Sequence, residues 1–233
     1  MSSNIVSEYR IKEKIIRPSE NDYDDFIHYP TATISDSFKR RQALYSSIKS
    51  VWGPISRVVG PAITVNATPG DEILALKAIE IAKPGDIIVV AGNNNSSSSF
   101  WGGVMSTMAK TRGVQALVTE GFIRDVEQCR DTKFPIWARG VSPIAPNMDV
   151  PPGELNLPIS IGNVLIHPGD LIVADEDGVA VVPREKIKET GNAVKERLEK
   201  EEEWLEEIKN TKQMILRDRV ESCLSNRSVE YLD

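Results

Sequence analysis

Residues 119–131, TEGFIRDVEQCRD, place an arginine and an aspartate side by side shortly after a glycine. Arg124 can hold a carboxylate through the fork of N–H donors on its guanidinium group, and Asp125 can bind a hard cation such as Mg2+. An arginine–aspartate pair at a helix start is more often a first-turn carboxylate next to a surface arginine. The pair therefore indicates a site only in combination with other features.

A second candidate lies earlier in the chain, where WGGVMSTMAKTRG follows a run of asparagine and serine residues. Gly102 and Gly103 leave the backbone N–H groups of a predicted helix start uncovered, and such groups bind carboxylate or phosphate oxygens. A glycine pair is more often a point of close packing, and a serine run is more often a loop.

The segments around both candidates alternate between apolar runs and helical patterns, which favours an α/β layer with parallel strands. Strands are predicted at 87–92, 114–119 and 134–140, and helices at 71–82, 102–112 and 124–131. Ligands bind outside the carboxyl ends of strands in open sheets of this kind. We therefore expect the glycine pair and Arg124-Asp125 to face one cleft.

The segments before this unit predict a helix and a strand. A helix is expected to open within 31–44, with Thr33 or Ser35 as its N-cap and Asp36 in its first turn. A strand is expected over 55–67, with a bulge or kink at Gly60-Pro61.

The pattern changes after Pro143. A proline-rich loop is expected over 144–162, followed by short strands within 163–183 and a hairpin at Asp177-Gly178 that could form a second β layer. A long charged helix is predicted over 193–216, with an apolar stripe that needs a covering surface on the same subunit or a neighbour. The stripe consists of Val194, Leu198, Leu205, Ile208 and Ile215.

Composition limits the function classes. The 233 residues are 40% hydrophobic and 27% charged, as in ordinary soluble domains, and the net charge of -6 disfavours nucleic acid and anionic membranes as partners. With a polar N-terminus and no apolar run near 20 residues, the expected location is cytoplasmic. Two cysteines and two histidines indicate neither a disulfide framework nor a multi-histidine metal site, and nucleotide-binding and hydrolase motifs are missing.

Three segments, 83–92, 101–143 and 167–183, resemble the RraA-like family, which includes 4-hydroxy-4-methyl-2-oxoglutarate aldolases and an RNase E regulator. The most specific part is GxxRD followed by FPxxARG, and the resemblance runs from about Ser35 to the C-terminal helix. It implies an α/β fold, a single-domain α-β-β-α sandwich with a long C-terminal helix. The expected parts are an N-terminal arm (1–30), a core domain (31–190) and a helical extension (191–233).

The resemblance also implies an activity. Aldolases of the family are class II lyases that use Mg2+ or Mn2+, cleave 4-hydroxy-4-methyl-2-oxoglutarate to pyruvate and decarboxylate oxaloacetate. Carried over by motif, Asp125 would be the metal ligand and Arg124 would contact the substrate. The backbone N–H groups of Val104 and Met105, beside Gly102 and Gly103, would hold the pyruvyl carboxylate.

Family members form ring-like trimers, sometimes hexamers, with sites at subunit interfaces. Asp36, Glu199 and Glu201 are therefore expected to reach a neighbour's site. Gly103 stands where aldolases commonly have an acidic residue, so the same proton relay is not expected. Two other functions stay open: a protein-binding regulator built on the same ring, and a sugar-binding or keto-acid-binding protein without turnover.

Overall fold

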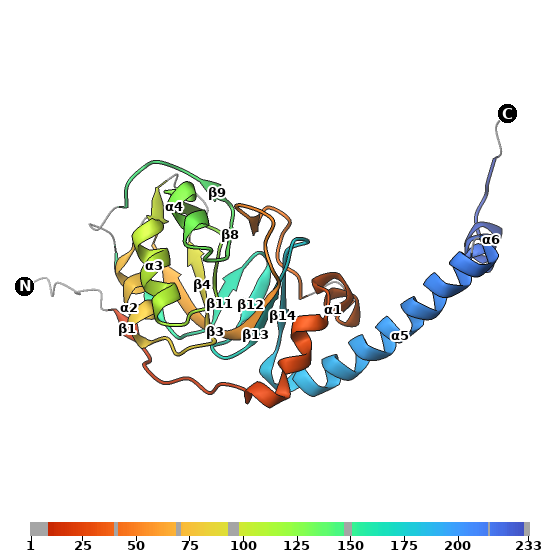
Figure 1. Cartoon of the computed structure of the whole chain (residues 1–233), viewed down its shortest axis with the longest axis horizontal. Coiled ribbons are helices and arrows are strands. Elements are labelled where there is room, and N and C mark those ends of the chain that lie inside the picture. The colour runs from red at the N-terminus through yellow and green to blue at the C-terminus, as the bar shows by residue number, and fades with distance from the viewer. Residues whose placement is uncertain are drawn as a thin grey trace, which may run out of the picture.

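The computed structural model describes residues 9–39, 42–68, 71–92, 98–146, 151–213 and 215–230. These residues form four layers in the order helix, sheet, sheet, helix, and a long helix leaves the body at one side (Figure 1). The predicted α-β-β-α sandwich is confirmed.

The main sheet supplies one β layer through four parallel strands, each a nearly continuous buried apolar run. They are β3 (Val58–Ala67), β4 (Ile87–Gly92), β6 (Ala116–Thr119) and β8 (Ile136–Ala138), paired in that order. Strands read as continuous apolar runs when both faces of their sheet are covered. The edges carry three two-residue strands, β1 (Arg10–Ile11), β10 (Glu154–Leu155) and β2 (Lys49–Ser50).

Strand β3 runs through Gly60-Pro61 as one continuous ten-residue strand, although the sequence predicted a bulge or kink. The strand changes partner at this point: residues 58–61 pair antiparallel with the second β layer, and residues 62–67 pair parallel with β4. A Cβ atom on Gly60 would lie 2.1 Å from the carbonyl oxygen of Gly85. Glycine is thus required by a close backbone approach.

The second β layer contains the predicted hairpin of β13 (Leu171–Ala174) and β14 (Val179–Val182), which pair antiparallel around Asp177-Gly178. A second hairpin joins β11 (Ile159–Ile161) to β12 (Val164–Ile166). Part of the expected loop over 144–162 is therefore wrong, since β10 and β11 lie within it. Ile159 and Ile161 are buried while Ser160 between them is exposed, as in a strand covered on one face.

Helices cover both outer faces of the sandwich. The main sheet carries α2 (Ile73–Ile81), α3 (Gly103–Thr111) and α4 (Val126–Asp131), and the second layer carries α1 (Thr31–Ser37), the short turn η3 (Arg184–Lys186) and α5 (Ile187–Thr211). Three separate clusters of buried apolar residues fill the three boundaries between the four layers.

Helix α1 begins at Thr31, and the predicted N-caps Thr33 and Ser35 lie inside it. Asp36 is near its end, so its predicted place in the first turn is also wrong. The cap comes from the second β layer: Asp175 accepts hydrogen bonds from the Thr31 backbone N–H at 3.0 Å and from its hydroxyl at 2.6 Å. A carboxylate distant in sequence thus satisfies the helix start.

Helix α5 is 25 residues long, starts earlier than predicted and is followed by α6 (Arg217–Ser225). Val194 is buried and Leu198 packs on the core, whereas Leu205 is 56% and Ile208 41% exposed. Ile215 lies beyond the end of α5, so its place in the stripe was wrong. No helix in the described part of the chain is long and apolar enough to cross a membrane.

The described part of the N-terminal arm contains β1 and two 3-10 turns, η1 (Glu20–Asp22) and η2 (Asp24–His28). Arg17 anchors it with two hydrogen bonds of 2.7 Å to the buried carboxylate of Asp86.

Candidate functional site

A small sheet that the sequence did not predict carries both candidate segments. Its three parallel strands are β5 (Ser99–Trp101), β7 (Phe122–Ile123) and β9 (Gly140–Val141). Gly102 follows β5 and Arg124 follows β7, and the Arg124 N–H donates to the Trp101 carbonyl at 2.9 Å. The two segments therefore meet as expected, at the carboxyl edge of this sheet instead of the main one. Residues 93–97, most of the asparagine–serine run, lie outside the described residues.

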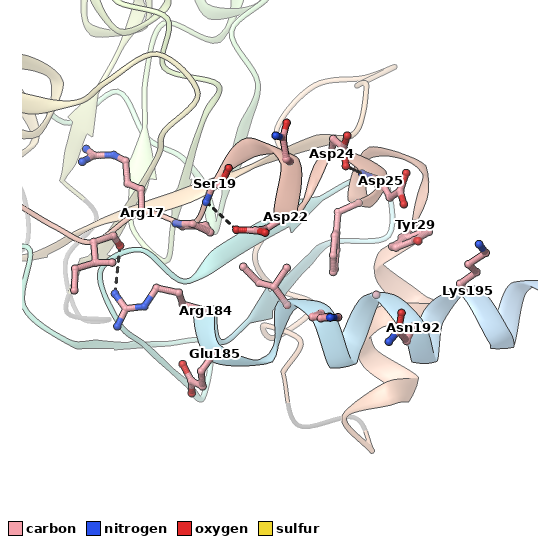
Figure 2. A pocket seen from close by; sticks show the side chains of 17 residues that line it. Arg17, Ser19, Asp22, Asp24, Asp25, Tyr29, Arg184, Glu185, Asn192 and Lys195 are labelled. Carbon is pink, nitrogen blue, oxygen red and sulfur yellow. Dashed lines mark hydrogen bonds between the residues drawn. The ribbon is translucent and has the colours of Figure 1, made fainter.

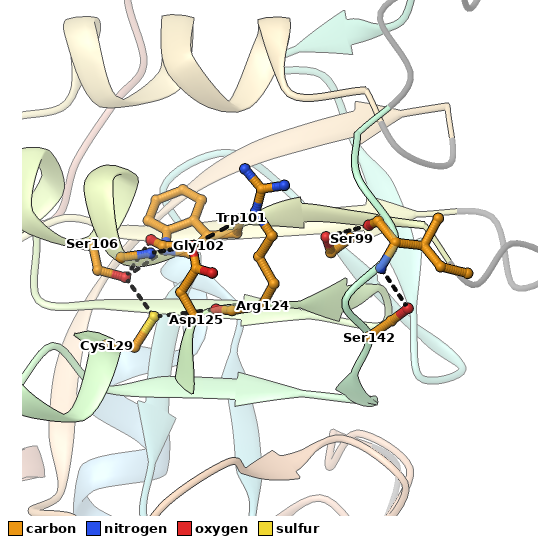
Figure 3. A network of polar contacts seen from close by, with 10 residues as sticks. Ser99, Trp101, Gly102, Ser106, Arg124, Asp125, Cys129 and Ser142 are labelled. Carbon is orange, nitrogen blue, oxygen red and sulfur yellow. Dashed lines mark hydrogen bonds and ion pairs between the residues drawn. The ribbon is translucent and has the colours of Figure 1, made fainter. Parts of the chain in front are cut away.

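Asp125 directs its carboxylate at the glycine pair (Figure 3). Its backbone is left-handed, with φ 56° and ψ 42°, a conformation that aspartate and asparagine tolerate better than most residues. Atom Oδ2 lies 3.4 Å from the Gly103 backbone nitrogen and 3.6 Å from Arg124 Nε. A Cβ atom on Gly102 would lie 2.5 Å from that oxygen, so this approach requires glycine.

The start of α3 faces the same region. Gly102 occupies the N-cap position and makes no side-chain capping bond, because glycine has no side chain. The first N–H groups of a helix have no partner within it and carry a partial positive charge. They can therefore bind an anionic group of a ligand.

A pocket of about 250 Å³ collects most of the predicted residues. Gly102, Val104, Met105, Arg124 and Asp125 all line it, and Gly103 lies beside them with its N–H toward Asp125. The remaining lining residues are Glu72, Leu76, Phe100, Trp101, Met108 and Pro146. The side chains of Arg124 and Asp125 are 39% and 44% exposed, so both remain accessible to a ligand.

A buried polar network supports the site from behind (Figure 3). The Ser106 hydroxyl accepts a hydrogen bond from Trp101 Nε1 at 2.9 Å and donates to the Gly102 carbonyl at 3.0 Å. Cys129 Sγ lies 3.3 Å from the same hydroxyl, and burial raises the pKa of this thiol. Cys129 is fully buried and does not line the pocket, so it packs behind the site. Sequence reasoning gave Trp101, Ser106 and Cys129 no role in the site, although all three lie in the candidate segments.

The donor set around Asp125 suits a hard cation that is shared with a substrate. Among the described residues there is no group of three or more histidine, cysteine, aspartate or glutamate side chains that could enclose a metal. Mg2+ commonly takes one or two carboxylates and completes its octahedron with water and substrate oxygens. Asp125, with Glu72 elsewhere in the lining, fits that pattern.

The residues predicted to reach a neighbour lie away from the pocket, on the layer of α1 and α5. Arg197 joins two of them: it is 3.9 Å from the Asp36 carboxylate and 2.7 Å from that of Glu201, and it stacks on Trp204. Glu199 is exposed on α5. Within one chain, therefore, the structure brings Asp36 and Glu201 together but places neither at Asp125.

Two of the cavities elsewhere among the described residues are larger. One of about 710 Å³ separates η1 and η2 from the first turns of α5 (Figure 2). Its two arginines have other partners, since Arg17 binds Asp86 and Arg184 donates to the Ile16 carbonyl. The other, about 470 Å³, lies at the carboxyl ends of the main strands and includes Glu120, whose pKa is raised by burial. Neither shares a lining residue with the pocket at Asp125.

Comparison with known proteins gives one family. The family model described as "RraA-like: Aldolase/RraA" matches residues 31–181. A Halalkalibacterium halodurans protein named "Putative 4-hydroxy-4-methyl-2-oxoglutarate aldolase" is 42% identical over 155 residues, covering 66% of this chain and 73% of that protein. The Thermus thermophilus 4-hydroxy-4-methyl-2-oxoglutarate aldolase is 28% identical over 153 residues, covering 66% and 92%.

A solved structure is similar over most of the chain. It is a Streptomyces coelicolor protein described as an unusual member of the RNase ES inhibitor RraA protein family, with a TM-score of 0.70 and 28% identity. The match covers 83% of this chain and 98% of that one. Relatives thus carry the names of both an enzyme and an inhibitor.

Proposed function

Because the chain belongs to the RraA-like family, we propose that it is a divalent-metal-dependent lyase that releases pyruvate from a 2-oxo acid. The observation that carries this proposal is the position of the Asp125 carboxylate. It lies at the start of α3, where it faces the Gly103 N–H, beside Arg124 and in a pocket large enough for a small acid. A cation site at Asp125 thus lies next to an anion site at the start of α3. An acid that binds a metal through its 2-oxo group and its carboxylate needs both.

Each group has a role that follows from its position. The N–H groups of Val104 and Met105 at the start of α3 bind the substrate carboxylate. Arg124 neutralises the oxygen on which negative charge develops as the carbon–carbon bond breaks. Asp125 holds Mg2+ or Mn2+, which when bound acts as a Lewis acid on the 2-oxo group.

The described lining of the pocket includes no lysine, so no lining amine is available for a Schiff base with the substrate. A cation held by Asp125 would supply electron withdrawal from the 2-oxo group, together with the fixed donors of the pocket. Both 4-hydroxy-4-methyl-2-oxoglutarate and oxaloacetate fit this requirement, because each carries a carboxylate next to a 2-oxo group.

The acidic cluster on the outer layer suits a site shared between subunits. Asp36 and Glu201 are already held together by Arg197, and the apolar residues Leu205 and Ile208 are exposed on the same helix. A homotrimer, or a hexamer of two trimers, would cover these apolar residues and bring Asp36, Glu199 or Glu201 to a neighbour's Asp125.

The proposal is tested by following pyruvate release from oxaloacetate and from 4-hydroxy-4-methyl-2-oxoglutarate with Mg2+ or Mn2+. Because the cations alone promote oxaloacetate decay, the rate must be compared with metal in the absence of protein. We expect protein-dependent release that EDTA abolishes and Mg2+ restores. A rate equal to the metal-only control with both acids would exclude the lyase.

The second candidate is a non-catalytic, protein-binding regulator. It is favoured by the solved relative described as a member of an RNase inhibitor family and by the protruding acidic helix α5. A stoichiometric protein partner, together with no heat of Mg2+ or Mn2+ binding in calorimetry, would favour this function over the lyase.

A further inference from the structure

Gln128 lies on α4 one turn after Asp125, and nothing in the sequence motifs gave it a role. A Cβ atom on Gly103 would lie 2.1 Å from its Oε1, 2.2 Å from its Cδ and 2.5 Å from its Cγ. The Gly103 backbone has no positive φ, so it does not itself demand glycine. The side chain of Gln128 therefore occupies the space that any side chain at residue 103 would need.

Asp125, at the N-cap of α4, and Gln128, within α4, lie beside different glycines of the pair. Asp125 lies over Gly102, and Gln128 lies over Gly103, whose N–H points to the Asp125 carboxylate. Asp125 is the N-cap residue of α4 and has a left-handed backbone, so its place beside Gln128 follows from these two approaches and not from helical spacing. The first turn of α3 is thereby held against α4 at two adjacent residues.

We propose that Gln128 is a positioning residue of this site. It packs beside Gly103 and fixes the first turn of α3, so that the anion-binding N–H groups keep their place relative to Asp125. Gln128 is exposed and does not line the pocket, so it acts through Gly103 and not by touching substrate. The ligand in this inference rests on the proposed function. The contact between Gln128 and Gly103 rests on the packing alone.

The contact is tested by thermal unfolding of Gly103→Ala in two backgrounds. Alanine in place of glycine in a helix interior ordinarily raises the melting temperature by about 2–4 °C in a chain of this size, and residue 103 is the first residue of α3, so a smaller rise is expected here. We expect a decrease in the wild-type background, where the new methyl group meets Gln128, and an increase in the Gln128→Ala background. An effect of the same sign in both backgrounds would overturn the contact.

The role is tested by calorimetry with Mn2+ and with oxalate, a small dianion that mimics a metal-chelating 2-oxo acid. Gln128→Ala should weaken oxalate binding to the Mn2+-loaded protein about tenfold, because the supports of ligand-binding groups typically contribute that much. Gln128→Glu should tighten Mn2+ binding about tenfold, because it places a second negative charge next to Asp125. Arg130→Gln, with the same charge change at an exposed residue of α4, is the matched control and should alter neither affinity.

The outcomes separate this inference from the proposed function. Wild-type affinities in both Gln128 variants would overturn the positioning role even if the protein releases pyruvate. A sign reversal at residue 103 together with weakened oxalate binding supports it even if no pyruvate is released, in which case only the lyase proposal fails.

Discussion

Replacing Asp125 by asparagine should separate catalysis from stability. The change removes the charge but keeps the shape, and asparagine tolerates the left-handed backbone that residue 125 adopts. The two contacts of the carboxylate are long, at 3.4 and 3.6 Å, and the side chain is 44% exposed. Such contacts contribute at most about 0.5 kcal/mol, so the melting temperature should change by no more than about 2 °C.

The effect on activity should be far larger. Asp125 is the residue that we expect to hold the cation, and the Lewis-acid contribution of a bound cation amounts to several kcal/mol. Loss of about 4 kcal/mol lowers kcat/KM by about a thousandfold. Pyruvate release at a Mg2+ concentration that just saturates the wild type measures this loss, and calorimetry should show the accompanying loss of cation affinity.

Asp175→Asn is the matched control, because it makes the same chemical change at a carboxylate with a structural role. Asp175 is only 7% exposed and accepts hydrogen bonds from the Thr31 backbone and hydroxyl, from the Asp177 N–H and from Arg57 Nε. We expect a cost of about 2–4 kcal/mol, a melting temperature lower by about 6 °C or more, and unchanged activity per folded molecule.

Two results would refute the reasoning. Full activity of Asp125→Asn would show that the carboxylate is not needed for catalysis. A fall in its melting temperature as large as that of Asp175→Asn would show that residue 125 supports the fold and not a ligand.

Three further predictions follow from other contacts. Burial alone would raise the pKa of Asp175, but its hydrogen bonds outweigh burial and hold that pKa below the ordinary value of about 3.9. The contribution of Asp175 to the free energy of unfolding is therefore complete above about pH 4 and is lost as pH falls through the folded pKa. Urea unfolding at a series of pH values should show this loss in the wild type. An equal loss in Asp175→Asn would contradict it. Arg17→Met leaves the buried carboxylate of Asp86 unpaired and should cost about 3 kcal/mol in urea unfolding, whereas a cost below about 0.5 kcal/mol would show that the ion pair is dispensable. Leu205→Glu combined with Ile208→Glu should reduce the mass found by light scattering to that of one chain, and an unchanged oligomer would place the interface elsewhere.

The elements that the sequence predicted well are those whose apolar pattern is complete within the segment. Strands β4 and β6 are continuous runs of apolar residues, and helix α2 has apolar residues at helical spacing. These patterns identify the elements without reference to a distant partner. The positions of Arg124-Asp125 and the glycine pair after predicted strands also led us to expect them at one cleft, and residues of both segments line one pocket.

The features that were missed depend on contacts between distant segments. Helix α1 is capped by Asp175 from another layer, so a search for a local capping residue was bound to choose wrongly. Strands β5 and β7 have only three and two residues, too few to show a periodicity, yet they position the site. Gln128 lies outside the GxxRD motif, and its role was inferred only from the space that its side chain occupies beside Gly103.

The change of partner in β3 ties the two halves of the sandwich to one backbone. Residues 58–61 carry the ladder to β13, and residues 62–67 carry the ladder to β4. Neither sheet can detach without pulling on a strand that is also embedded in the other. Because β3 belongs to both ladders, opening either one should disrupt the other. We therefore expect the β13 amides and the β4 amides to exchange their hydrogens through the same global opening, with equal free energies.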